Sequence, residues 1–242
     1  MLHNILFNRS AARPLARRSL WLWGLCMSLL ISGMATAGQK QPLRYLALGD
    51  SYTIGEAVAE SERWPMQLAA ALRRDGIELA TPRIIAQTGW TTDELSAAMD
   101  AAEPLGQWDL VSLLIGVNNQ YRGRDLAEFE QQFEALLTRA LGLVDGQPDR
   151  AFVLTIPDWG VTPFAEGRDR AAIGQQLDAF NAAVRRIATK HEVKVVDIAP
   201  VSRQRGAEPD MVASDGLHPS GQLSRQWTER AVPVVRELLS HR

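Results

Sequence analysis

Short apolar runs alternate with longer amphipathic stretches from residue 43 onward. This alternation is typical of a sheet built from βα units, in which a helix follows each strand. It predicts five strands, at residues 44–48, 83–87, 109–115, 151–156 and 194–198. Segment 109–115 (DLVSLLI) is almost continuously apolar, which predicts a central parallel strand covered on both faces.

The stretches between these runs have apolar residues at helical spacing. They predict helices at residues 64–74, from 91 or 92 onward, at 126–143, at 173–190, and from a Ser220 cap to about 239. The sequence shows no internal repeat or linker that would divide this part of the chain. We therefore predict one three-layer α/β/α domain with a central parallel sheet of about five strands, in which ligands bind outside the carboxyl ends of the strands.

Residues 1–37 have the pattern of a signal peptide. Four arginines and no acidic residue precede an uncharged, largely apolar run at 19–34, and Ala35-Thr36-Ala37 offers small residues that suit a signal peptidase. We predict cleavage after Ala37, export by the Sec route to the periplasm or the exterior, and a mature domain of residues 38–242.

A retained membrane anchor is the alternative interpretation of this segment. The strongly apolar residues end near Ile31, short of the ~20 residues that a spanning helix needs. Arg17-Arg18 is a faint twin-arginine pattern, but no later motif suggests a cofactor that would require folding before export. A lipid-modified cysteine is normally preceded by a small residue, but Leu25 precedes Cys26. The sequence therefore supports a lipoprotein only weakly.

Cleavage would change the composition in two ways. It would remove Cys26, the only cysteine, which excludes disulfides, cysteine catalysis and cysteine-ligated metal in the mature chain. It would also lower Lys and Arg from 26 to 22 against 28 Asp and Glu, so that the formal net charge moves from −2 to −6. This charge disfavours nucleic acid and anionic membrane surfaces as partners.

Polar residues suited to catalysis follow four of the five predicted strands. Gly49-Asp50-Ser51 follows the first, Gly89 the second, and Gly116-Val117-Asn118-Asn119 the third, while Asp215-Gly216-Leu217-His218 lies in a loop after the fifth. Because parallel strands end at the same edge of a sheet, we expect these four segments to lie on one edge.

A serine hydroxyl becomes an effective nucleophile when a base takes its proton and a carboxylate orients that base. His218 and Asp215 can supply both groups for Ser51, because the two residues between them let the carboxylate turn back to the imidazole. The other histidines after residue 37 are His191, at the end of a predicted helix, and His241, next to last. His218 is therefore the predicted base.

Acyl transfer also requires donors aimed at the developing oxyanion. The backbone N–H groups of Ser51 and Gly89 and the side-chain amide of Asn118 would converge there from three adjacent strand ends. Glycine suits its position because a missing side chain lets a substrate approach the N–H closely.

At these positions the sequence resembles the SGNH/GDSL hydrolases. The segments LALGDSYTIGE, AQTGWTT, GVNN and SDGLHPS look like the four blocks of that family, in their usual order and across nearly the whole mature chain. The resemblance implies a flavodoxin-like fold, a shallow open site, and hydrolysis of esters or thioesters without a cofactor. Two positions depart from the family pattern. Tyr52 replaces a leucine, and Asn119 stands where many members have an aspartate. The second departure bears on how Asn118 is held.

Each of these segments also has a purely structural interpretation, as a turn, a loop amide or a helix-entry loop. Their joint occurrence in family order is what indicates catalysis. Asp50 is expected to hold its turn, and Asp158 to be structural. Trp90, Trp159 and Phe164 lie near loops on the same edge, where each either lines an acyl or sugar pocket or packs in the core.

The motifs of several other enzyme classes are missing. The chain has no G-x-S-x-G elbow, phosphate-binding loop, dinucleotide fingerprint or H-E-x-x-H zinc motif. The expected function is an exported serine esterase acting on a small-molecule, glycan or lipid ester. The alternatives are an acyltransferase or deacetylase of cell-envelope glycans, and a non-catalytic envelope-binding protein. The acyl chain, the leaving group and the oligomeric state do not follow from the sequence.

Overall fold

The computed structural model describes residues 41–240. The predicted signal peptide and its cleavage site lie outside the described residues, as do Cys26 and His241. No helix within residues 41–240 combines the length and the apolar character needed to cross a bilayer.

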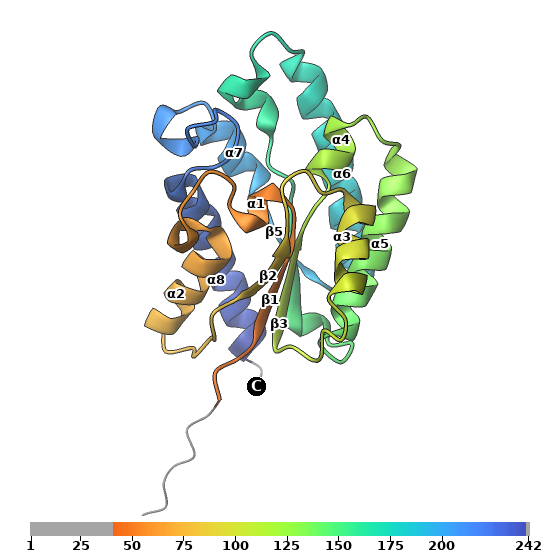
Figure 1. The fold of residues 1–242 in the computed structure, drawn as a ribbon, viewed down its shortest axis with the longest axis vertical. Coiled ribbons are helices and arrows are strands. Elements are labelled where there is room, and N and C mark those ends of the chain that lie inside the picture. Colours follow the sequence, from red (N-terminus) through yellow and green to blue (C-terminus); the bar gives the residue numbers. More distant parts are fainter. Residues whose placement is uncertain (1–40, 241–242) are drawn as a thin grey trace, which may run out of the picture. The chain divides into compact units, whose positions relative to one another are not determined.

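Five parallel strands form one sheet (Figure 1). They are β1 (Tyr45–Gly49), β2 (Arg83–Ala86), β3 (Leu110–Leu114), β4 (Ala151–Leu154) and β5 (Lys194–Val196). Their order across the sheet is β2-β1-β3-β4-β5, so β3 is the central strand, as its continuous apolar sequence predicted. This order is the flavodoxin-like one, whose ligand crevice lies at the switch point between β1 and β3.

Helices cover both faces of the sheet and confirm the three-layer prediction (Figure 1). On one face lie α2 (Trp64–Arg74) and α8 (Gly221–Ser240), and on the other α3 (Thr92–Ala101), α5 (Leu126–Gly142) and α6 (Arg170–Lys190). Shorter elements are α1 (Ser51–Ile54), α4 (Val117–Tyr121), α7 (Ala199–Arg205), η1 (Glu60–Glu62), η2 (Pro148–Arg150), η3 (Trp159–Val161), η4 (Pro163–Ala165) and η5 (Pro209–Met211).

Side-chain caps set where the long helices begin. Thr91 forms a capping box with Glu94 at the start of α3, and Ser220 Oγ accepts from the backbone N–H groups of Gln222 and Leu223 at 3.2 and 3.3 Å before α8. Helix α6 begins before the predicted residue 173 because Asp169 caps it by accepting from a backbone N–H. The predicted start of α3 and the predicted Ser220 cap of α8 are thus confirmed.

The sequence predicted that strand β4 would end at residue 156, but it ends at Leu154. The backbone N–H and C=O of Ile156 bond the side-chain amide of Asn181, at 2.7 and 2.9 Å, and do not continue the strand ladder. At β5, the N–H of Ile198 likewise bonds Thr155 Oγ1, so this strand stops at Val196 and not at 198. Side chains thereby end two strands where loops begin to shape the edge of the sheet.

Candidate active site

Ser51 is the first residue of α1, separated from the end of β1 by Asp50 alone, and it is buried. Asp50 caps this short helix, because its Oδ1 accepts from the Tyr52 backbone N–H at 3.1 Å. Gly49 is required before the turn, since a Cβ there would collide with the Thr53 side chain and the Leu114 carbonyl. The backbone therefore holds Ser51 at the carboxyl end of the strand.

Asp50 itself is fully buried, and its Oδ2 has no hydrogen-bond partner within residues 41–240. Burial raises the pKa of this carboxyl to about 7, against the opposing effect of backbone hydrogen bonds, that from Tyr52 foremost. The capping bond agrees with the turn-holding role predicted for Asp50.

His218 and Asp215 are paired in the loop before α8. His218 Nδ1 lies 2.6 Å from Asp215 Oδ2, and Asp215 Oδ1 accepts from the backbone N–H groups of Leu217 and His218, each at 2.9 Å. Partial burial opposes ionisation of Asp215, but the bonds from His218 and Leu217 outweigh it and lower the pKa of the carboxyl. With Nδ1 bonded to a carboxylate, the neutral imidazole presents Nε2 as the acceptor.

Ser51, Asn118 and His218 line one cavity of about 150 Å³. The three segments that carry them come from the end of β1, the end of β3 and the loop before α8, so the structure brings together residues far apart in the sequence. The remaining lining residues are largely apolar: Tyr52, Val117, Tyr121, Trp159, Phe164 and Leu217.

Gly89 lies in the turn after β2 with φ +89°, a conformation that favours glycine. Neither Gly89 nor Trp90 is among the residues that line this cavity, and Trp90 packs partly buried against the core. The turn is nevertheless tied to α4: Asn118 Nδ2 donates to the Trp90 carbonyl at 2.9 Å, and Arg122 Nη2 donates to the Gly89 carbonyl at 2.6 Å. A binding role for Trp90 stays a prediction.

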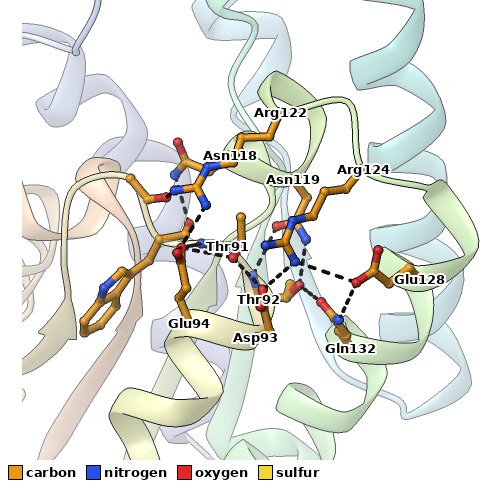
Figure 2. A network of polar contacts seen from close by, with 12 residues as sticks. Thr91, Thr92, Asp93, Glu94, Asn118, Asn119, Arg122, Arg124, Glu128 and Gln132 are labelled. Carbon is orange, nitrogen blue, oxygen red and sulfur yellow. Dashed lines mark hydrogen bonds and ion pairs between the residues drawn. The ribbon is translucent and has the colours of Figure 1, made fainter.

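Asn119 has a structural role in the same network (Figure 2). Its Oδ1 accepts from the Thr92 backbone N–H at 3.1 Å, and its Nδ2 donates to Thr92 Oγ1 at 2.7 Å. An ionised aspartate can accept but not donate. Asn119 thus fastens the start of α3 to α4 with a donor and an acceptor, next to Asn118.

An aromatic wall, which we define as Tyr121, Trp159 and Phe164, bounds the cavity. Ring centroids lie 5.4 to 6.3 Å apart, and the Arg168 guanidinium sits 5.2 to 5.4 Å from each of the three rings. Tyr121 and Phe164 are 46% and 38% exposed. Sequence reasoning selected Trp159 and Phe164 but missed Tyr121 and Arg168, because no sequence pattern links either residue to the site.

Asp158 is buried, directly precedes the wall residue Trp159 in the chain and makes structural contacts. Its Oδ2 accepts from Arg203 Nε at 2.8 Å and its Oδ1 from the Gly160 backbone N–H at 2.9 Å. These contacts agree with the structural role predicted for it. Within residues 41–240, no group of three or more His, Cys, Asp or Glu side chains is arranged to hold a metal ion.

Comparison with known proteins identifies the family. Residues 47–225 match the model of the GDSL-like lipase/acylhydrolase family, and this range includes the four sequence blocks described above except for Leu46, the first residue of the first block. A search of curated proteins finds no match.

Solved structures with the same fold include several esterases. A crystal structure of TesA has 20% identity and a TM-score of 0.62, covering 81% of this chain and 99% of that one. The psychrotrophic esterase EstA from Pseudoalteromonas sp. has 14% identity and a TM-score of 0.62, covering 82% and 99%. A variant of Axe2, an acetyl-xylooligosaccharide esterase from Geobacillus Stearmophilus, has 19% identity and a TM-score of 0.61, covering 80% and 94%. At these identities the likeness establishes the fold.

Proposed function

The chain belongs to the GDSL-like lipase/acylhydrolase family and is a carboxylic ester hydrolase, and from this we propose that it is an exported serine esterase with Ser51 as nucleophile. The observation that carries the proposal is the His218–Asp215 pair, 2.6 Å apart, at the same cavity as Ser51. Export rests on the signal-peptide pattern of residues 1–37. Intact-mass measurement of the secreted or periplasmic protein tests it, with a mature chain starting at Gly38 as the expected result.

The proposed reaction has two stages. His218 Nε2 takes the proton of Ser51 Oγ, which attacks the ester carbonyl carbon; the bond to the alcohol oxygen then breaks, and the alcohol leaves with the proton from His218. Water next attacks the acyl-enzyme with His218 again as base, which releases the acid and restores Ser51. Asp215 keeps Nδ1 protonated and stabilises the imidazolium in both stages.

Three donors would stabilise the oxyanion that forms in each stage. Within residues 41–240, the backbone N–H groups of Ser51 and Gly89 donate to no protein acceptor. Asn118 uses one amide hydrogen for the Trp90 carbonyl, which leaves the second for the substrate. Two free N–H groups and an oriented amide are the donor types that such a hole requires.

The cavity favours a compact ester group. An apolar cavity of ~150 Å³ is large enough to hold a benzene molecule, and this one has about the same volume. We therefore propose short acyl esters, with roughly six non-hydrogen atoms accommodated against the aromatic wall. Trp159 and Phe164, for which the sequence left pocket lining and core packing open, both line this cavity.

Initial rates on p-nitrophenyl esters from acetyl to palmitoyl test the proposal, with Ser51→Ala as the matched variant. The expected result is hydrolysis by the native protein with an optimum among the short chains, and loss of turnover in the variant. Equal rates for both proteins would contradict the nucleophile. If both were inert while folded, esterase activity would be excluded and a non-catalytic role would replace it.

Acyl transfer to a glycan is the second candidate. It is favoured by the exposed rings of Tyr121 and Phe164 beside the nucleophile, which offer a surface on which a sugar ring can stack. The same assay with added sugar alcohols distinguishes the two functions, because a transferase forms acylated sugar faster than free acid.

A further inference from the structure

The turn that carries Gly89 has little to hold it in place by itself. Gly89 has no side chain and adopts φ +89°, and the one backbone hydrogen bond that closes the turn, from the Trp90 N–H to the Gln87 carbonyl, is 3.3 Å long. Glycine has the widest conformational freedom of any residue. An N–H that must point at an oxyanion therefore needs support from outside the turn.

Arg122, the C-cap residue of α4, provides such support with both ends of its guanidinium (Figure 2). Nη2 donates to the Gly89 carbonyl at 2.6 Å, and Nη1 donates to Glu94 Oε1 at 3.1 Å. Glu94 Oε2 in turn accepts from the Thr91 backbone N–H at 2.8 Å. The fork of one arginine thus links the carbonyl of Gly89 to the first turn of α3.

Helix α4 holds two successive carbonyls of this segment. Arg122 binds that of Gly89, and Asn118 binds that of Trp90. Fixing both carbonyls fixes the planes of the peptide groups 89–90 and 90–91, which restricts the backbone torsions of Trp90 and anchors Gly89 on its carbonyl side. The Gly89 N–H belongs to the preceding peptide group, so its direction is set relative to this fixed plane by the torsions of Gly89 alone. Asn118 is also a proposed oxyanion donor. Helix α4 and its C-cap residue therefore position two proposed donors, the Asn118 side-chain amide and the Gly89 N–H.

We propose that Arg122 is a positioning residue for the oxyanion hole: it holds the Gly89 turn so that the Gly89 N–H points at the reacting carbonyl oxygen. This inference rests on the proposed esterase function. Both Nη atoms of Arg122 are bonded within the protein, to Glu94 Oε1 and to the Gly89 carbonyl, so in this proposal it acts through Gly89 and not on the substrate.

The exposure of Arg122 allows its positioning role to be separated from folding. The side chains of Arg122 and Glu94 are 41% and 38% exposed, and ion pairs this exposed contribute little to stability. Arg122→Gln is therefore expected to fold with an almost unchanged melting temperature. Any loss of activity then reports on the geometry of the turn.

Arg124 offers a matched control on the same segment. It pairs with Asp93 at 2.8 Å and with Glu128 at 3.6 Å, and within residues 41–240 its side-chain hydrogen bond goes to Asp93 and not to the Gly89 turn. Arg124→Gln removes an equal charge and comparable ion pairs. It leaves the support of Gly89 intact.

Steady-state kinetics on a short p-nitrophenyl ester form the first test. We expect Arg122→Gln to lower kcat by about 10- to 100-fold, because a misplaced donor loses its transition-state bond. KM should stay within about twofold, since ground-state binding is untouched. Arg122→Lys should recover part of the loss, because an ammonium can reach the Gly89 carbonyl but cannot bridge to Glu94 as a fork does. Arg124→Gln should match the native enzyme.

Amide ¹⁵N relaxation at Gly89 forms the second test and needs no turnover. We expect the Gly89 amide to be more mobile in Arg122→Gln than in the native protein. In Arg124→Gln its mobility should be unchanged. Unchanged kcat, equal losses in both variants, or an unchanged Gly89 amide would overturn the inference. A native protein inert on all esters would contradict the proposed function instead, and the relaxation comparison would still decide whether Arg122 holds the turn.

Discussion

The carboxylate of Asp215 holds the proposed base through both of its oxygens. Oδ2 contacts the imidazole, while Oδ1 accepts two backbone N–H groups and so fixes the loop itself. Asp215→Asn keeps an oxygen for the loop but presents an amide that cannot stabilise an imidazolium. We expect kcat to fall by about 10²- to 10⁴-fold with little change in melting temperature. Rates on a short ester with parallel thermal unfolding check this, and near-native kcat would remove Asp215 from the proposed mechanism.

At the residue scale, sequence reasoning works where spacing alone fixes the contact. Asp215 and His218 are three positions apart in one loop, so their pairing follows from local geometry. Arg122 and Gly89 are separated by 33 positions and meet because α4 packs beside the turn. No sequence pattern marks Arg122, because an arginine after a short helix has many possible partners until tertiary packing selects one.

At the scale of single elements, Gly116 controls how α4 leaves β3. It has φ +125°, and a Cβ there would lie 2.6 Å from a ring carbon of Phe129 and 2.8 Å from Cδ1 of Ile156. Gly116→Ala should destabilise the protein by about 1–3 kcal/mol, through strain and overpacking. Thermal unfolding measures this. Gly123→Ala is the control, because it shares a positive φ, +66°, but has nothing within 4 Å, so its loss should be smaller.

The aromatic wall is built by two short 3₁₀ elements, η3 and η4, together with the end of α4. Phe164 is the single phenylalanine of this wall, is 38% exposed and lines the cavity. Phe164→Ala should move the optimum of kcat/KM toward longer acyl chains, because each added methylene that finds apolar contact gains ~0.8 kcal/mol. Phe164→Leu, which keeps most of the bulk, should shift it less. An unchanged chain-length profile in both variants would show that the wall does not select the acyl group.

Long elements were predictable and short ones were not. Helix α2 begins and ends at the predicted residues, and α5 ends one residue early, because many turns of apolar spacing define these helices. Helices α1 and α4 span four and five residues, too few to show a period, and only the turn residues that precede them were predictable. These two short helices carry Ser51 and Asn118, so the elements nearest the proposed chemistry are the hardest to infer.

For the molecule as a whole, the buried Asp50 makes stability depend on pH. Its folded-state pKa of about 7 lies above the usual 3.8, so between these values the unfolded chain is ionised while the folded one keeps its proton, and stability falls as pH rises. Asp50→Asn keeps an oxygen for the Tyr52 N–H and carries no charge. Its stability relative to the native protein should therefore be higher at about pH 8 than at about pH 4.

Thermal unfolding at both pH values measures this difference. Asp215 has the opposite linkage, since its lowered pKa gives stability that is present above the usual pKa and lost on acidification. Both proteins retain Asp215, so its contribution cancels in the comparison. A difference between Asp50→Asn and the native protein that is independent of pH would contradict the raised pKa of Asp50.

The positions of Ser51 and His218 along the chain determine when each residue is present during synthesis. Ser51 follows the first strand, and His218 comes after the fifth, shortly before α8, which packs against α2. A chain that grows from its N-terminus presents the proposed nucleophile early and the proposed base only near completion. An unfinished chain, or one cut before His218, therefore holds Ser51 without the histidine proposed to activate it, and we expect hydrolysis to begin only when synthesis is nearly complete.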